Sequence, residues 1–147
     1  MGILDTFEVG RQGLNVHSKR IQIAAKNIAN LDTPNYVRKI PVLNATEDIS
    51  FAGLLNTMKE DVFGIGTVPF VSGGVRFTGT VEDPTQGERI YRPGHPDADE
   101  NGYVRMSNVN PMVDMADAVL AQRAYEASLG VMNIAKSMSQ RALQIGE

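Results

Sequence analysis

The sequence predicts an α+β protein in which two long terminal helices form a coiled-coil-like helical core, with a small β-rich domain between them. Apolar residues recur at seven-residue intervals near both ends of the 147-residue chain, while its centre is rich in Gly, Pro and short alternating runs. The expected divisions are 1–31 for the N-terminal helix, 32–108 for the β-rich domain and 109–147 for the C-terminal helix.

The C-terminal helix is expected from Val109 to Ile145, because two apolar columns share one helical face at alternating spacings of four and three. It would be about 50 Å long at about 1.5 Å per residue, too long for so small a chain to cover. Further apolar residues outside the columns indicate burial on several sides. The first column is Val113, Leu120, Ala127 and Ile134, and the second is Ala124, Val131, Met138 and Ile145.

The N-terminal helix is expected from about Ile3 to Asn30, antiparallel to the first if the two pair within one chain. Gly10 and Gly13 weaken its first half by up to about 1 kcal/mol each, so this end is expected to be kinked, frayed or ordered only on assembly. Pro34 disfavours helix at the residue before it and so marks the end. The apolar column that recurs every seventh residue is Phe7, Leu14, Ile21 and Ile28.

The central region combines one short helix with several strands. Apolar residues at helical spacing predict a helix near 50–62, followed by a glycine-rich link over 64–74. Residues 75–81 alternate as a strand with Val75, Phe77 and Val81 on one face, and 36–43, 89–92 and 103–106 are further extended candidates. The punctuated stretch 93–102 predicts a loop.

Composition excludes several functions. The chain has no cysteine, which removes disulfides and thiolate chemistry. It has no Lys/Arg block, which gives nucleic-acid binding little support, and no apolar run of transmembrane length. No nucleophile, base and orienting group can be placed together, so we expect no enzymatic activity and no cofactor.

One stretch imitates a calcium loop. Residues 97–102 place oxygen donors at alternate positions and a glycine sixth, but the twelfth position, normally Glu, is Asn108. An acidic hairpin loop accounts for the same residues, and calcium binding is the less favoured reading.

The stretch Asn27-Ile28-Ala29-Asn30-Leu31-Asp32-Thr33-Pro34-Asn35-Tyr36 resembles the N-terminal signature of bacterial flagellar axial proteins, the rod and hook subunits, with Asn35 in place of the usual glycine. Residues 91–99, 102–104 and 108–111 are similar to the proximal rod members of this family. Residues 123–127 and 133–138 are similar to their C-terminal helix.

This resemblance implies a structural subunit of the basal-body rod that polymerises helically in the periplasm and transmits torque. It also implies partners among copies of itself and the other proximal and distal rod subunits, and export by the flagellar type III apparatus without a cleaved signal. A different rod or hook component is the alternative. The residues expected at assembly contacts are Phe7, Leu14, Ile21, Asn27, Ile28, Asn30, Thr33, Pro34, Tyr36, Val113, Leu120, Arg123, Ala124, Tyr125, Val131, Asn133, Ile134, Met138 and Ile145.

Overall fold

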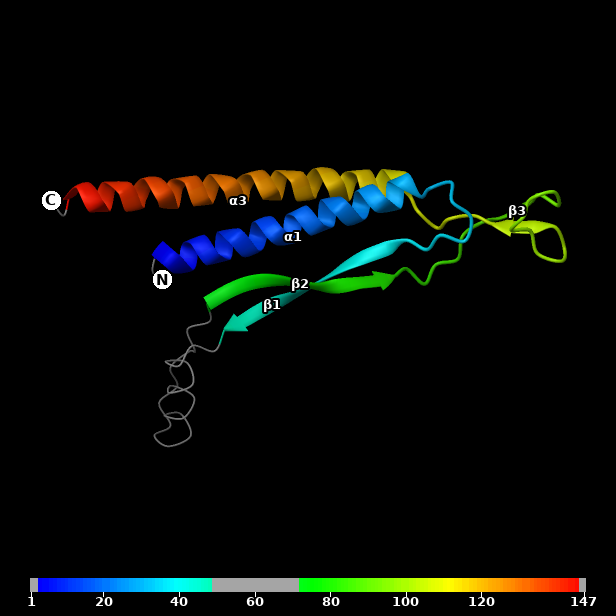
Figure 1. Cartoon of the computed structure of the whole chain (residues 1–147), viewed down its shortest axis with the longest axis horizontal. Coiled ribbons are helices and arrows are strands. Elements are labelled where there is room, and N and C mark those ends of the chain that lie inside the picture. The colour runs from blue at the N-terminus through cyan, green and yellow to red at the C-terminus, as the bar shows by residue number, and fades with distance from the viewer. Residues whose placement is uncertain (1–2, 49–71, 146–147) are drawn as a thin grey trace, which may run out of the picture.

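The computed structural model describes residues 3–48 and 72–145. Two long helices, α1 and α3, lie side by side and antiparallel, and both chain ends lie at the same end of the molecule (Figure 1). The predicted α+β architecture with long terminal helices is therefore confirmed, whereas the helix expected near 50–62 falls outside the described residues. The elements in order are α1 (Ile3–Ala29), β1 (Lys39–Asp48), β2 (Ser72–Glu82), β3 (Arg89–Tyr91), β4 (Tyr103–Arg105) and α3 (Pro111–Ile145).

Local sequence explains where α3 begins. Pro111 occupies the first helical position, where its missing N–H is not needed. Asn110 caps the helix: its side-chain oxygen accepts hydrogen bonds from the backbone N–H groups of Met112 at 3.1 Å and Val113 at 3.4 Å. Asp114 places a negative charge in the first turn, where the helix dipole favours it.

The end of α1 is equally well specified. Asn30 donates from its side chain to the Lys26 carbonyl at 2.7 Å, and the Thr33 hydroxyl donates to the Asn30 side-chain oxygen at 3.2 Å. Asn35 then adopts a left-handed conformation with φ of 58°, which Asn tolerates better than most residues. Its substitution for glycine in the signature is thus structurally mild.

Strands β1 and β2 form a twisted antiparallel ribbon that packs against α1 on the side away from α3 (Figure 1). The glycines Gly73 and Gly74, expected in a link, belong to β2 because they pair with Glu47 and Thr46. Val81 is exposed, whereas Val75 and Phe77, which were expected on the same face of β2, are half-buried. A bulge between Val42 and Leu43 interrupts the alternation before Val81 is reached.

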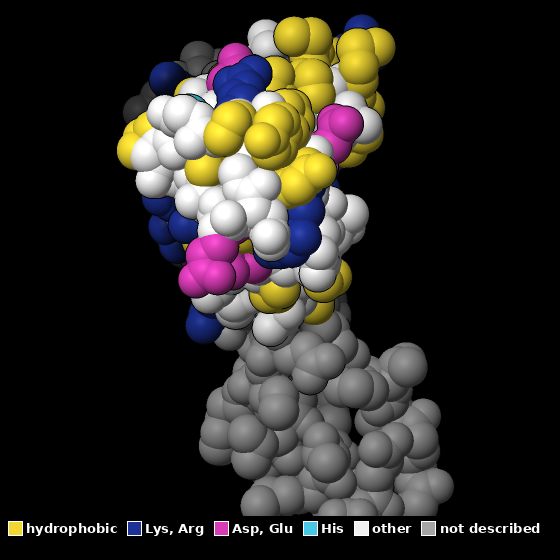
Figure 2. Space-filling model, turned by 90° about the vertical axis from the view of Figure 1, so that its right-hand side faces the viewer, with side chains coloured by type: hydrophobic (Ala, Val, Ile, Leu, Met, Phe, Trp, Pro, Cys, Tyr) yellow, Lys and Arg dark blue, Asp and Glu magenta, His cyan; other side chains and the backbone are white. Residues whose placement is uncertain are grey.

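Strands β3 and β4 form a second, short ribbon at the end opposite the termini (Figure 1). Val104 is buried on one face, while Tyr91 and Tyr103 meet edge to face on the other with ring centroids 5.3 Å apart. Viewed from this end, clusters of exposed hydrophobic side chains are bordered by charged ones (Figure 2).

The core is thin and lies along α1. Its buried apolar side chains include Val16, Ile23 and Ala24 from α1 and the small Ala121 and Ala135 from α3. Among the described elements α3 packs against α1 alone, so most of its circumference has no cover within this chain. Neither described helix carries an apolar stretch long enough to cross a bilayer.

Candidate assembly surface

The face of α3 that packs on α1 is offset by one residue from the predicted apolar columns. The residues turned inward fall one position after each predicted one, and several are small or polar. This corrects the expectation that the apolar columns pair with α1. The inward positions are Asp114, Ala121 and Ala135, which are buried, and Ala118, Tyr125, Ser128, Met132 and Ser139, which are half-buried.

Small residues occupy several of these positions, and the two helices approach most closely at two glycines of α1. A Cβ atom at Gly10 would lie 2.7 Å from Met132 Cγ, and one at Gly13 would lie 3.1 Å from Ser128 Oγ. The two glycines therefore make room for α3, and α1 is a continuous helix through both. The predicted fraying at this point is wrong, and ordering on assembly stays a prediction.

The predicted columns of α3 instead form an exposed apolar surface, which we call the outer stripe. Val131 is 50% exposed, and Ile134 and Met138 are each 61% exposed. Apolar side chains left uncovered along most of a helix mark a surface for binding another protein. The exposed members of the outer stripe are Val113, Leu120, Ala127, Val131, Ile134 and Met138.

The other predicted contact residues divide by position. On α1, Phe7, Leu14, Ile21 and Ile28 are all half-buried, because the α3 contact and the ribbon cover neighbouring faces of that helix. On α3, Ala124 is half-buried between the inward face and the outer stripe, Arg123 and Asn133 are exposed, and Ile145 ends the helix.

Asn27 is the centre of a polar junction that joins the helices to β1. Its side-chain nitrogen donates to Asp114 Oδ1 at 2.9 Å and to the Lys39 carbonyl at 2.9 Å. Its side-chain oxygen accepts from the Lys39 backbone N–H at 3.0 Å and from the Tyr36 hydroxyl at 3.1 Å. One buried amide thus links α1, the connection, β1 and α3.

Arg38 supplies the charge of this junction. Its Nε donates to Asp114 Oδ2 at 2.9 Å, and its terminal nitrogens lie 3.5 Å from Asp83 and 3.6 Å from Asp117. The hydrogen bond to Asp114 raises the pKa of Arg38 above its usual value. Because the guanidinium compensates Asp114, that carboxylate can be 98% removed from solvent.

Neighbouring ionisable groups respond to the same environment. Burial and the Asp114 carboxylate raise the pKa of Tyr36, so its hydroxyl remains a donor to Asn27. Hydrogen bonds from Thr85 lower the pKa of Asp83, and Arg38 adds to that effect. Asn108 accepts from the Arg38 backbone N–H at 2.6 Å and ties the junction to the chain that enters α3.

Sequence reasoning identified Asn27 and Tyr36 but missed Arg38 and Asp114. Asp114 has the position of an ordinary N-terminal helix acid, and Arg38 is followed directly by the equally basic Lys39, so its sequence context does not single it out. One signal in the sequence could have pointed to this pair. Asp114 interrupts an apolar run at the start of the helix, and a carboxylate that becomes buried there needs a positively charged or hydrogen-bonding partner.

The loop that imitates a calcium site has another explanation. Asp99 Oδ1 accepts from the backbone N–H groups of Asn101 at 3.0 Å and Tyr103 at 2.8 Å, so it closes the turn between β3 and β4. Asp97 lies 3.6 Å from His95. In the part of the chain that the structure describes, no three acidic or histidine side chains converge as metal ligands.

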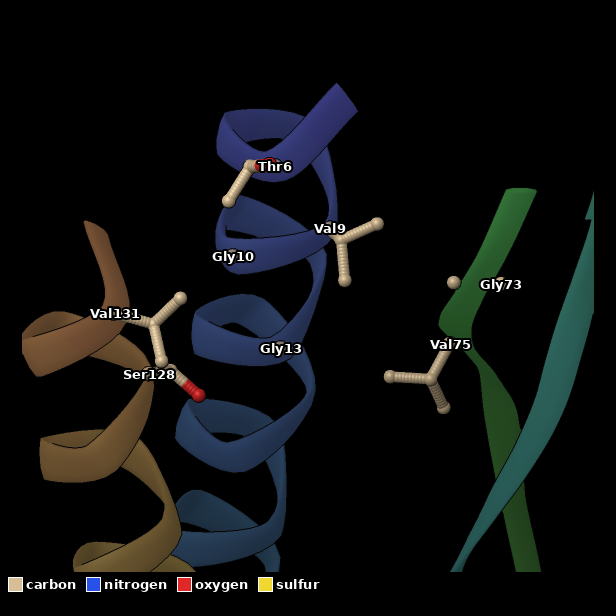
Figure 3. A pocket seen from close by; sticks show the side chains of 9 residues that line it. Thr6, Val9, Gly10, Gly13, Gly73, Val75, Ser128 and Val131 are labelled. Carbon is tan, nitrogen blue, oxygen red and sulfur yellow. The ribbon is translucent and has the colours of Figure 1, made fainter. Parts of the chain in front are cut away.

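An open pocket lies between the N-terminal half of α1, the start of β2 and α3 (Figure 3). Its volume is about 410 Å³ and no ionisable side chain lines it. Val9 and Val75 face each other across the gap, while Ser128 and Val131 project from α3 toward α1 (Figure 3). The lining residues are Thr6, Val9, Gly10, Gly13, Gly73, Gly74, Val75, Ser128 and Val131.

Comparisons with known proteins agree with this architecture. Residues 7–36 match the family described as "Flagella basal body rod protein", and residues 100–145 match "Flagellar basal body rod FlgEFG protein C-terminal". The two matches fall on the paired terminal helices and the segments beside them. The class is therefore that of flagellar basal-body rod proteins, which are structural components of the flagellum.

Full-length relatives narrow the class to one family. The chain is 32% identical over 148 residues to the flagellar basal-body rod protein FlgC of Salmonella typhimurium, and 31% identical over 157 residues to that of Bacillus subtilis. It is 30% identical over 148 residues to that of Escherichia coli O157:H7, and each comparison covers all of both chains. The chain belongs to the FlgC family, and its place is the flagellar basal-body rod.

Proposed function

We propose that this rod subunit polymerises helically through the outer stripe of α3, as part of the proximal rod, and that the polymer transmits torque for motility. The observation that carries the proposal is that the apolar columns of α3 lie outside its contact with α1, so that Val131, Ile134 and Met138 are at least half exposed. Covering such a stripe gains about 25 cal/mol per Å² of apolar surface removed from water. Its partners are further copies of the chain and the other rod subunits.

The same surface suits a purely structural role. No ionisable side chain lines the pocket between α1, β2 and α3, and the Asn27 amide and the Asp114 carboxylate are engaged in hydrogen bonds within the chain. The junction supports the proposal in another way, because the hydrogen bonds of Asn27 and Arg38 hold the start of the ribbon rigidly against both helices. Torque transmission requires that stiffness. We assign Asn27 and Tyr36 to this junction, and Asn30, Thr33 and Pro34 to the end of α1 that leads into it.

Assembly in the periplasm requires passage across the inner membrane. We propose that the chain is exported by the flagellar type III apparatus without a cleaved signal. The half-buried α1 column and the thin core support export as an unfolded chain, since few large side chains must be released from the folded state.

The test is the substitution Ile134→Asp in a bacterium whose own copy has been replaced. A buried, unpaired carboxylate in the middle of the stripe costs several kcal/mol, so rods should fail to form and motility should be lost. The near-UV signal of the Tyr91–Tyr103 pair should be unchanged, because that pair lies at the far end of the molecule.

Gln140→Asp is the matched control. Gln140 is also exposed on α3, but it lies outside the outer stripe. Motility should persist in this variant. Normal swimming in the Ile134→Asp strain would contradict the proposed interface.

A further inference from the structure

The pocket between α1, β2 and α3 has the form of a socket. Gly10 and Gly13 of α1 and Gly73 of β2 lie around it and contribute no side chain (Figure 3), and Gly74 of β2 also lines it. We infer that this pocket receives the Ile134 side chain from α3 of a second copy of this chain. The inference rests on the proposed helical assembly and specifies which surfaces meet.

The chemistry of the pocket fits an aliphatic side chain. Its side-chain walls are chiefly Val9, Val75 and Val131, with no ionisable group among the lining residues. A volume of about 410 Å³ accommodates one isoleucine side chain together with part of the helix that bears it. A charged or strongly polar occupant would find too few partners for its hydrogen bonds.

The position of Val131 indicates where the occupant comes from. Val131 lines the pocket and is also a member of the outer stripe, so the two surfaces are continuous. A helix that covers the stripe on this side therefore also covers the mouth of the pocket. The described residues carry most of their exposed large hydrophobic side chains on α3, which makes α3 of a neighbouring copy the complementary element.

The copy that owns the pocket cannot fill it with its own Ile134. Ile134 lies three positions after Val131, and because each position advances about 100°, the two side chains point about 60° apart around the helix. Ile134 consequently remains 61% exposed. The contact joins two different surfaces, the Ile134 side chain of one copy and the pocket of the next. Each copy in the polymer therefore has one of each surface available for a further copy, as a non-closing helical polymer requires.

Cysteine cross-linking tests this contact in assembled basal bodies. The chain has no native cysteine, so introduced thiols report on one contact only. Gly73 is the site for the first thiol, because no atom lies within 4 Å of a Cβ built there. The second thiol is Ile134→Cys. Oxidation of basal bodies that contain the Gly73→Cys, Ile134→Cys double variant should produce a ladder of dimers, trimers and longer species.

The cross-linked fraction should exceed that of either single variant at least tenfold. The matched control is Gly94→Cys with Ile134→Cys, since Gly94 also has open space but lies at the β3–β4 end, and it should give no ladder. Intact rods without a ladder, or dimers alone from Gly73→Cys by itself, would overturn the socket and leave helical assembly standing. Rods that form in the Ile134→Asp strain would instead overturn the assembly proposal.

Discussion

Asn27 contributes to the fold through both ends of its amide. It satisfies the backbone N–H and carbonyl of Lys39 and one oxygen of Asp114, and it is 1% exposed. A helix-end signature is usually read as local stop chemistry. In this chain that reading holds for Asn30 and Thr33, whereas Asn27 reaches 87 residues along the chain to α3.

Replacing Asn27 with Ala should therefore lower the free energy of unfolding by about 3 kcal/mol, because several buried polar groups lose partners at once. Chemical denaturation of the purified chain measures the change. Asn30→Ala is the control: its hydrogen bonds are exposed and local, so its cost should be about 1 kcal/mol or less. An equal decrease in the free energy of unfolding in both variants would show that the buried junction stabilises the fold no more than a local helix-end hydrogen bond does.

His17 gives the fold a pH dependence. Burial lowers its pKa from 6.5, Arg20 lowers it further, and its buried Nδ1 has no hydrogen-bond partner. His17 therefore binds a proton more tightly in the unfolded chain than in the folded one. The free energy of unfolding is unaffected by this group above pH 6.5, and it decreases as the pH falls through the lowered pKa that His17 has in the folded state.

The expected result is a lower urea midpoint at pH 5.5 than at pH 7.5, and a smaller difference in His17→Phe. The lowered pKa values of Asp83 and Glu8 affect stability only at more acidic pH, because the ordinary values of these groups are 3.8 and 4.5. A midpoint that stays constant over this range in the unaltered chain would rule out the assigned role.

The two helices show which structural features sequence periodicity can predict and which it cannot. Seven-residue spacing predicted both helices and the apolar columns of α3, and the structure has both helices nearly where expected. The spacing alone could not decide which face of α3 packs on α1, because the columns of large apolar residues lie next to a row of positions that includes several alanines and serines. The choice depends on Gly10 and Gly13, whose missing side chains leave room for Met132 and Ser128 of α3.

The partners of the junction were beyond prediction for a different reason. Arg38 and Asp114 lie 76 residues apart, and nothing local marks them as a pair. Alternation predicted extended segments in both ribbons, and turn residues predicted the hairpin loop between β3 and β4, whereas the pairing of β1 with β2 was not predicted. The bulge in the long ribbon has no counterpart in the sequence pattern.

Gly13→Leu should separate α1 from α3. A leucine would occupy the space now filled by Ser128, so we expect the thermal midpoint measured by far-UV circular dichroism to fall by several degrees, corresponding to about 1–3 kcal/mol. Gly130→Ala is the opposite case, because it lies in α3 with no atom near the added methyl group. That variant should gain about 1 kcal/mol from helix propensity.

If Gly13→Leu left the midpoint unchanged, the close approach of the helices would not hold in solution.

As a whole, the molecule is a stack of three layers with α1 in the middle and α3 covered on one side only. Stability should decline along α3 away from the junction, because the remaining contacts there involve small side chains. Neighbouring copies would supply the cover that a single chain lacks.

Hydrogen exchange can follow this difference. In the isolated chain we expect the amides of residues 130–145 to exchange at least tenfold faster than those of residues 16–27, and to become protected in assembled rods. Mass spectrometry of peptides from both states measures the change. Uniform strong protection of both helices in a monomeric sample would contradict an assembly role for α3.

The inward face and the outer stripe of α3 are offset by only one residue, so a small rotation of the helix would exchange them. One residue inserted between Asp114 and Leu120 would advance every later position by about 100°, and each member of the outer stripe would take the place of its inward neighbour. Leu120 would then replace Ala121, and Ile134 would replace Ala135, against a helix that admits only small side chains there. Length in this segment should be far less variable than composition, and an insertion of seven residues should be better tolerated than an insertion of one.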